Sequence, residues 1–298
     1  MQFTDEPVHV RVPATSANLG PGFDSAGLAL SLHDDVVVRV TGSGLSVRVE
    51  GEGADEVPRG ERHLVVRSLR AAFDRLGSQP AGLEISCTNR IPHARGLGSS
   101  SAAIVSAIVA ACSLVADADL DEQARLDLAD ELEGHPDNVA ACLRGGVTFA
   151  WTQPDGPRVV RLDAHADLAP VAFVPPTRSS TKQVRGLLPD TVPYADAVLN
   201  ASRAALLPHA LTLNPALLLA ATEDRLHQGY RAPAMPGSAA LMSALRAQGV
   251  PAVVSGAGPT VLALTTKADR AAVLTAREGW QVLPLEVELR GAHVVRKH

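Results

Sequence analysis

Aromatic residues are scarce in this sequence and make up 3% of its 298 residues. Proteins that hold single-stranded nucleic acid commonly stack its bases on aromatic side chains, so we expect no such platform here. Positive charge is not in excess either. The formal net charge of -5 argues against a general nucleic-acid binder, although it leaves room for a local basic pocket that binds a small anion.

Cysteines and long hydrophobic runs are also few. Cys87, Cys112 and Cys142 are odd in number and far apart, which favours reduced, buried residues over a disulfide or a zinc site. The longest apolar run follows Ser101 and is interrupted by two serines, so it is shorter than the ~20 strongly apolar residues of a membrane span. The first residues lack the basic and apolar regions of a secretory signal. These absences predict a soluble, cytoplasmic protein.

Lysine is absent between Arg59 and Lys182, and this absence excludes one familiar phosphate site. The P-loop requires a lysine at the end of its glycine-rich motif. The dinucleotide-binding fingerprint requires a third glycine where this chain has Ser101. The stretch Gly96-Leu-Gly-Ser-Ser-Ser101 is therefore either an ordinary loop or an anion site of another class.

The residues after this stretch, 102–116, are almost wholly small or aliphatic, which predicts a helix buried on all sides. Gly96 and Gly98 permit left-handed backbone conformations and a close approach of the main chain to a ligand. Ser99 and Ser100 are good N-cap candidates, and a helix start offers unpaired N–H groups to a phosphate. From this stretch alone, a loop ahead of a core helix and an anion cradle are equally well supported.

Hydrophobic patterning predicts strands and helices that interleave without a strict βαβ repeat, which indicates an α+β fold of two layers. Predicted strands cover residues 8–12, 35–40, 45–49, 83–87, 147–151, 159–162, 171–174, 251–254, 261–264 and 281–288, and residues 26–32 form a separate apolar stretch. Predicted helices cover residues 63–76, 102–116, 121–133, 193–206, 214–228, 237–248 and 268–277. A turn cluster at 153–157 predicts a boundary between domains 1–152 and 153–298.

Three glycine-rich segments each follow a predicted strand, where loops can converge on one ligand. They are Pro13-Ala-Thr-Ser-Ala-Asn-Leu-Gly-Pro-Gly-Phe-Asp24, Gly96-Leu-Gly-Ser-Ser-Ser101 and Ser255-Gly-Ala-Gly-Pro-Thr260. In order and spacing they resemble the three signatures of the GHMP kinases, a superfamily that includes galactokinase, homoserine kinase, mevalonate kinase and phosphomevalonate kinase. The resemblance covers nearly the whole chain, and the first segment is similar to the form found in homoserine kinases.

The resemblance implies a fold and a reaction. The fold would be a two-domain GHMP kinase fold, with an N-terminal domain like ribosomal protein S5 domain 2, containing a left-handed βαβ crossover. A ferredoxin-like α/β sandwich would follow, with the active site in the cleft between the domains. The reaction would use ATP and Mg²⁺ to phosphorylate the side-chain hydroxyl of L-homoserine, on the route to L-threonine.

Two alternatives remain open. One is a GHMP kinase for another small alcohol, such as mevalonate, and the other is a catalytically silent sensor of a nucleotide or an amino acid. We expect no nucleic-acid or membrane partner, and the resemblance makes a homodimer a further expectation.

For the nucleotide, the resemblance implies that the loop Gly96–Ser101 wraps the ATP phosphates while Ser100, or its neighbour Ser99, reaches the magnesium. Glu133 matches the family's magnesium-binding glutamate. Without the resemblance, Glu133 would be interpreted as a solvated residue at a helix end. Glu131 is a nearby alternative for the magnesium ligand. His63 stands where the family commonly has asparagine near the adenine, which puts the base preference in question. The full nucleotide set is His63, Pro92, Arg95, Gly96, Leu97, Gly98, Ser99, Ser100, Ser101, Gly256 and Gly258.

For the amino acid, the resemblance implies Asn18, Asp24, His135, Asn138, Thr181, Arg185 and Arg231. Arginine forms bidentate pairs with carboxylates, which suits Arg185 and Arg231 to the substrate carboxylate, although each alone reads as a surface charge. Several relatives place an aspartate base where this chain has Asn138. An amide takes no proton at neutral pH, so we predict direct transfer with Asp24 orienting the hydroxyl. The predicted catalytic set is Asp24, Asn138, Ser100 and Glu133.

Overall fold

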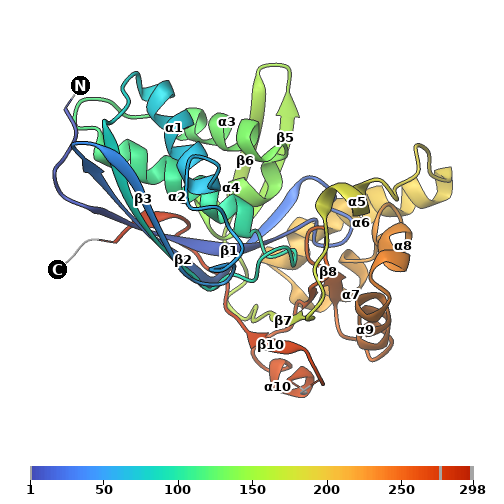
Figure 1. Ribbon diagram of the computed structural model, residues 1–298. Coiled ribbons are helices and arrows are strands. Elements are labelled where there is room, and N and C mark those ends of the chain that lie inside the picture. The colour runs from blue at the N-terminus through green and yellow to red at the C-terminus, as the bar shows by residue number, and fades with distance from the viewer. Residues whose placement is uncertain (1, 275–276, 296–298) are drawn as a thin grey trace.

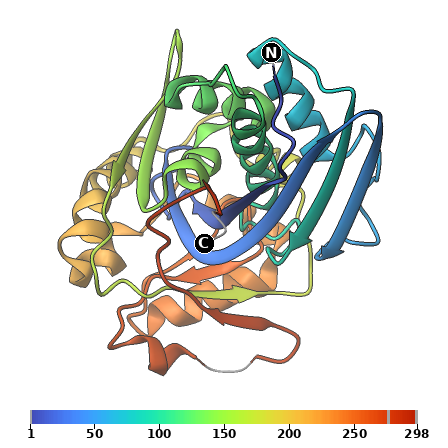
Figure 2. The same cartoon turned by 90° about the vertical axis from the view of Figure 1, so that its left-hand side faces the viewer.

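The computed structural model describes residues 2–274 and 277–295, which form two β-sheets with helices packed against them (Figure 1). The N-terminal end of the described chain lies beside the helices, where Phe3 bridges Val115, and the C-terminal end lies at the first sheet. Strands β7 (Val171–Val174) and β10 (Gln281–Pro284) and helix α10 (Arg270–Val273) form a separate layer below that sheet (Figure 2). No helix within the described residues is long and apolar enough to cross a membrane.

The first sheet has seven strands in the order β11-β1-β2-β4-β3, with β5 paired to β2 and β6 paired to β5. Its strands are β1 (Val8–Ala17), β2 (Ala26–Thr41), β3 (Gly44–Gly51), β4 (Gly82–Asn89), β5 (Val147–Gln153), β6 (Gly156–Leu162) and β11 (His293–Val294). β2 is one long strand where the sequence predicted an apolar stretch and a separate strand. The parallel pair of β3 and β4 is joined through α1 (Leu64–Leu76) and forms a βαβ unit. The left-handed sense expected of such a unit stays a prediction.

Four helices accompany this sheet, namely α1, α2 (Ser99–Leu114), α3 (Glu122–Glu133) and α4 (Pro136–Arg144). α2 and α4 pack on β1 and β2, while α1 packs on α2 and α3 packs on α4 (Figure 1). α2 is buried along nearly its whole length, as its apolar composition predicts, because it lies between the sheet and the other helices. α4 was not predicted. Gly134 ends α3 in a left-handed conformation, and Pro136 begins α4 directly afterwards.

The second sheet runs in the order β10-β7-β9-β8, with all neighbours antiparallel. Its strands are β7 (Val171–Val174), β8 (Ala252–Val254), β9 (Val261–Ala263) and β10 (Gln281–Pro284). Helices lie between the first and second of these strands and again between the third and fourth, where α10 (Arg270–Val273) stands; α9 (Pro236–Ala247) packs on β8 and β9. This βαββαβ pattern, with strand order 4-1-3-2, confirms the ferredoxin-like prediction.

The helical segment between β7 and β8 departs from the predicted helices, and its short first helix, Thr181–Arg185, was not predicted. It comprises α5 (Thr181–Arg185), α6 (Tyr194–Thr212), η1 (Pro215–Leu217), α7 (Leu218–Ala221), α8 (Gln228–Arg231), η2 (Ala232–Ala234) and α9. The single helix predicted over 214–228 is wrong. The Asp224 carboxylate accepts the backbone N–H groups of Leu226, His227 and Gln228 at 3.0, 3.2 and 2.8 Å, which turns the chain ahead of α8 instead of continuing α7.

Sheet pairing also corrects the predicted boundary after residue 152. That boundary cuts the hairpin of β5 and β6, because β6 pairs with β5 in the first sheet. The strand predicted over 281–288 ends at Pro284, and the chain then returns to the first sheet, where Val287 bridges Leu30 and β11 pairs with β1. The helix predicted over 268–277 is limited to α10, and residues 275–276 lie outside the described residues.

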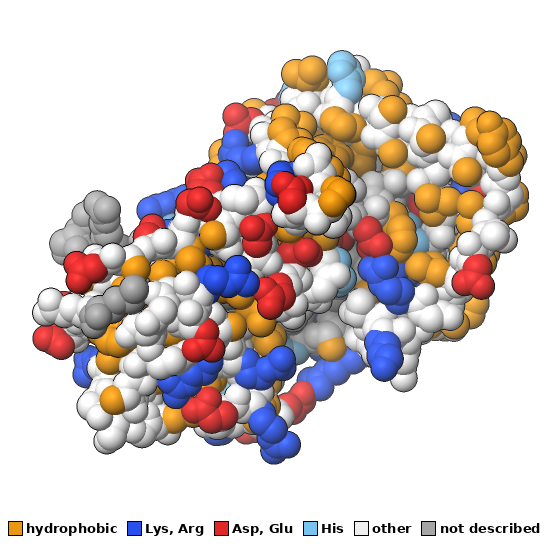
Figure 3. All heavy atoms as spheres, turned by 90° about the horizontal axis from the view of Figure 1, so that it is seen from above, with side chains coloured by type: hydrophobic (Ala, Val, Ile, Leu, Met, Phe, Trp, Pro, Cys, Tyr) orange, Lys and Arg blue, Asp and Glu red, His pale blue; other side chains and the backbone are white. Residues whose placement is uncertain are grey.

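The surface carries charges of both signs mixed over the face seen from above (Figure 3). At the end of the molecule formed by α6, hydrophobic side chains are more frequent (Figure 3), and the side chains of Tyr194 and Val198 on that helix are exposed. The homodimer stays a prediction.

Candidate functional site

The three glycine-rich segments meet where β1, α2 and β8 come together. Asn18 donates from Nδ2 to the carbonyl of Gly256 at 2.8 Å, and Ser255 donates from Oγ to the carbonyl of Gly96 at 2.6 Å. The N–H of Gly256 donates to the carbonyl of Ala17 at 3.1 Å. Segments that are far apart in the sequence thus lie side by side, as their positions after strands predicted.

Gly96 and Gly98 are required by the protein's own packing. Both have positive φ, and a Cβ atom added to them would lie 2.2 Å from the Ser255 carbonyl oxygen and 2.0 Å from Thr15 Oγ1, respectively. The N-cap of α2 is Gly98, so the predicted caps, Ser99 and Ser100, are instead the first residues of the helix. The leading N–H groups of α2 have no partner within the helix and point out of its N-terminus, as an anion site requires.

Glu133 lies beside the first turn of α2. Its Oε1 accepts hydrogen bonds from Ser100 Oγ at 2.6 Å and from Ser101 Oγ at 3.0 Å. The competing residue Glu131 is instead paired with Arg75 at 2.7 Å on the surface. No cluster of three or more His, Cys, Asp or Glu able to hold a metal occurs within residues 2–274 and 277–295. One carboxylate with hydroxyls suits Mg²⁺, which keeps water and phosphate ligands.

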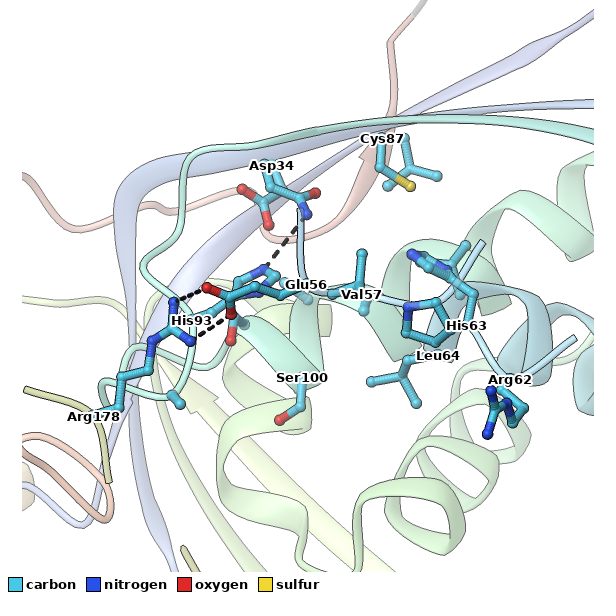
Figure 4. A pocket seen from close by; sticks show the side chains of 18 residues that line it. Asp34, Glu56, Val57, Arg62, His63, Leu64, Cys87, His93, Ser100 and Arg178 are labelled. Carbon is cyan, nitrogen blue, oxygen red and sulfur yellow. Dashed lines mark hydrogen bonds and ion pairs between the residues drawn. The ribbon is translucent and has the colours of Figure 1, made fainter. Parts of the chain in front are cut away.

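A cavity of about 450 Å³ adjoins the start of α2 (Figure 4). Its walls are largely apolar and include Val36, Val57, Leu64, Val65, Ala102 and Ala103. His63 lies in the wall with only 6% of its surface exposed, and its Nδ1 has no hydrogen-bond partner among the described residues. Burial lowers the pKa of His63, so the ring is neutral and offers one donor and one acceptor. The cavity therefore has the size and character of a site for a heteroaromatic base.

The mouth of this cavity carries an ion pair that the sequence did not reveal. Arg178, which follows β7, donates to both carboxylate oxygens of Glu56 in the segment between β3 and α1, with one contact at 2.7 Å (Figure 4). Arg95 donates to the carbonyls of Pro175 and Pro176 at 3.0 and 2.9 Å. The predicted nucleotide residue Arg95 thus anchors the segment that presents Arg178. No local pattern links residues 122 positions apart.

Asp24 and Arg185, which were both predicted to contact the substrate, contact each other. The guanidinium of Arg185 donates to the two carboxylate oxygens of Asp24 at 2.9 and 2.7 Å, and this hydrogen bonding raises the pKa of Arg185. Asn18 Oδ1 accepts the backbone N–H of Asp24 at 3.0 Å, which holds Asp24 in a left-handed conformation. The pair is about 40% exposed on each side, so a ligand can reach it.

The other predicted substrate residues lie around the start of α4 and on α5. Asn138 accepts from Thr15 Oγ1 at 2.8 Å through its Oδ1. His135 Nδ1 lies 3.1 Å from Asp137 Oδ1, and this hydrogen bond raises the pKa of His135. Thr181 begins α5, one turn before Arg185, and forms no side-chain hydrogen bond with the described residues. Two further nucleotide residues, Pro92 and Leu97, are buried behind the loop.

Arg231 is buried rather than a surface charge, with 2% of its surface exposed. Its Nη1 lies 3.2 Å from His227 Nδ1 and 3.3 Å from the Gly256 carbonyl oxygen, while its Nε has no partner among the described residues. The guanidinium carbon lies 5.1 Å from the ring centre of Phe23, and that of Arg185 lies 5.5 Å from the same ring. The two predicted arginines therefore converge on one aromatic side chain, which the sequence reading had not singled out.

Comparison with known proteins adds family evidence to this geometry. The chain matches the model of the GHMP kinases N terminal domain over residues 63–146 and the model of the GHMP kinases C terminal over residues 199–278. The second match ends within the ferredoxin-like unit, and the first covers α1 to α4.

The homoserine kinase of Streptomyces avermitilis is 60% identical over 97% of this chain and 95% of its own length. Among solved structures, a homoserine kinase from Cytophaga hutchinsonii has a TM-score of 0.84 and 27% identity, with 99% of both chains covered. The mevalonate kinase of L. major has a TM-score of 0.69 over 97% of this chain and 98% of its own. At 16% identity, that last likeness shows the fold alone.

Proposed function

Because this chain belongs to the homoserine kinase family of the GHMP kinases, we propose that it transfers the γ-phosphoryl group of ATP to the side-chain hydroxyl of L-homoserine. The observation that best supports L-homoserine as the substrate is the ion pair of Asp24 and Arg185 near the buried Arg231. The carboxylate of an amino acid can replace Asp24 as the partner of Arg185. The amino and hydroxyl groups of the same molecule can then donate hydrogen bonds to the Asp24 carboxylate. The product would be O-phospho-L-homoserine, made in the cytoplasm for L-threonine synthesis.

The nucleotide assignment is supported by the cavity and the helix start next to it. The adenine would lie between the apolar walls beside His63, and the triphosphate would extend toward the N–H groups of Ser99, Ser100 and Ser101 at the start of α2. In this arrangement Gly96, Gly98, Gly256 and Gly258 shape the wall.

The metal assignment is supported by the contact of Ser100 with Glu133. These two residues would hold Mg²⁺ through oxygen atoms while water and phosphate oxygens complete its shell. The bound ion would neutralise charge on the β- and γ-phosphates. Glu133 and Ser100 position that charge, and the α2 start adds its N–H groups.

Phosphoryl transfer of this type depends mainly on positioning and charge neutralisation. Asn138 stands where a base would be needed, and its Oδ1 is already engaged by Thr15. We therefore propose that the substrate hydroxyl attacks directly, oriented by Asp24, and passes its proton to the transferred phosphate or to water. Intact contacts at Ser100 and Glu133 favour this over a catalytically silent sensor.

Purified protein with Mg²⁺ and ATP is expected to release ADP at roughly 1–100 per second when L-homoserine is present. Mevalonate and galactose serve as the matched acceptors, and omission of any acceptor gives the background. Coupled detection of ADP measures the rate. Turnover with mevalonate but not with L-homoserine would favour the other GHMP kinase reading, and ATP binding without turnover of any acceptor would favour the sensor.

We propose that Arg178, at the mouth of the cavity, leaves Glu56 and pairs with a phosphate group of bound ATP. Arg178→Ala is therefore expected to raise the KM for ATP about fivefold, a modest effect because the pair is exposed to solvent. Glu56→Gln is expected to act in the opposite direction and lower the KM for ATP about twofold, since it frees Arg178 and removes a negative charge from the mouth of the cavity. Initial rates over a range of ATP concentrations measure both. Arg158→Ala, in the exposed Arg158–Asp155 pair on the β5–β6 hairpin, is the control. Equal increases in the KM for ATP in Arg178→Ala and Glu56→Gln would mean that the ion pair only stabilises the structure around the entrance of the cavity.

A further inference from the structure

His227 is a fully buried side chain that connects two parts of the site. Its Nε2 lies 2.8 Å from the carbonyl oxygen of Gly20 in the first glycine-rich segment, and its Nδ1 lies 3.2 Å from Arg231 Nη1. The ring also stacks on Phe23, with centroids 4.8 Å apart and planes 19° apart. His227 belongs to no motif and was not among the site residues predicted from the sequence.

The two partners of His227 determine its protonation. A carbonyl oxygen only accepts, so Nε2 carries the hydrogen that is donated to Gly20. A guanidinium only donates, so Nδ1 is the unprotonated acceptor for Arg231. Burial lowers the pKa of His227, although the Asp224 carboxylate, 3.7 Å from Nε2, opposes this shift. The ring is therefore the neutral Nε2–H tautomer.

This tautomer accounts for the position of Arg231. The arginine has few other anchors, namely the weak contact with the Gly256 carbonyl and the ring of Phe23, and its Nε has no partner among the described residues. Because His227 accepts from Nη1, the orientation of the guanidinium is fixed on that side. Its Nη2 and Nε groups form no hydrogen bond with the described residues. Phe23 stacks on His227, and its ring also lies close to the guanidinium groups of Arg231 and Arg185.

We propose that His227 is a positioning residue that orients Arg231 toward the substrate carboxylate and ties it to the Gly20 segment. The inference rests on the proposed function, because it is there that Arg231 is given a substrate. His227 itself does not touch the reacting atoms.

Two isosteres separate the two hydrogen bonds of His227. In His227→Asn, the side-chain oxygen takes the place of Nδ1 and keeps the acceptor for Arg231. In His227→Gln, the amide nitrogen takes the place of Nε2 and keeps the donor to Gly20 but leaves Arg231 without its acceptor. We expect His227→Gln to raise the KM for L-homoserine about tenfold, as for loss of one charge-assisted hydrogen bond. His227→Asn should keep that KM within about twofold, and both should keep kcat and the KM for ATP.

If His227 had a purely structural role, both variants would lose thermal stability and activity to the same extent, and their KM values for L-homoserine would not differ. Equal effects of the two variants on the KM for L-homoserine, or a parallel rise in the KM for ATP, would overturn the proposal. The ¹⁵N NMR spectrum of histidine-labelled protein supplies a readout that needs no activity. It should show His227 as the Nε2–H tautomer at pH 7, with an Nδ1 resonance that moves in Arg231→Lys. An Nδ1–H tautomer or a cation there also overturns the proposal, whereas a wild-type protein with this tautomer but no homoserine turnover refutes only the proposed function.

Discussion

Glu133→Gln is expected to lower kcat roughly 10²–10³-fold, the largest loss of any single change considered. The substitution keeps the size of the side chain and one oxygen for Ser100 and Ser101, so the start of α2 should keep its shape. What it removes is the single carboxylate proposed to hold the metal beside the phosphates. Loss of one charge-stabilising group in such a site costs about 3–4 kcal/mol in the barrier. Steady-state rates at saturating ATP and L-homoserine measure the effect.

Glu131→Gln is the matched control for this prediction. The same residue type, two positions earlier on α3, is paired with Arg75 on the surface and should leave kcat within about twofold. The Mg²⁺ dependence of the rate supplies a second readout, because the Glu133 variant should need a higher Mg²⁺ concentration for half-maximal activity. If Glu131→Gln caused the larger loss, the metal assignment would pass to the competing glutamate.

Local signals in the sequence were sufficient to predict the elements proposed to bind the nucleotide. The apolar run after Ser101 predicted a buried helix, because no face of it could tolerate water, and α2 is buried. The glycines at 96 and 98 predicted backbone with positive φ, and both residues adopt it. A Cβ atom at either position would clash with Ser255 or Thr15. The sequence could not identify these two neighbours, because they are distant along the chain.

Side-chain hydrogen bonds, one set local and one between distant segments, account for what was missed. The helix predicted over 214–228 has a regular pattern, but the buried Asp224 carboxylate binds the N–H groups that the helix would have used. In the site, the signatures identified Asp24 and Arg185 separately, while their pairing depends on the contact of the first glycine segment with α5. His227 stands four residues before Arg231, a spacing that places both side chains on one face of a helical turn, and that signal could have been read.

Arg231→Ala is expected to raise the KM for L-homoserine about 10²-fold while the KM for ATP stays within about twofold. Bidentate arginine–carboxylate hydrogen bonds contribute about 2–3 kcal/mol, and the truncation removes both at once. Arg231 is not among the residues that line the proposed nucleotide cavity. The change also leaves His227 Nδ1 without its partner and removes one of the two guanidinium groups next to Phe23, so some loss of thermal stability is expected. Initial rates with each substrate varied in turn, together with a thermal melt, separate the two effects.

Arg231→Lys provides the control, because it keeps the charge but cannot form the bidentate pair. It should recover part of the thermal stability and only a small part of the affinity for L-homoserine, leaving the KM roughly tenfold above that of the wild type. Such a result would assign the specificity to the planar guanidinium and not to charge alone. In both variants, the KM for ATP could instead rise in parallel with the KM for L-homoserine. That result would mean that Arg231 stabilises the contact between the glycine-rich segments. The substrate carboxylate would then have to be bound by Arg185 alone.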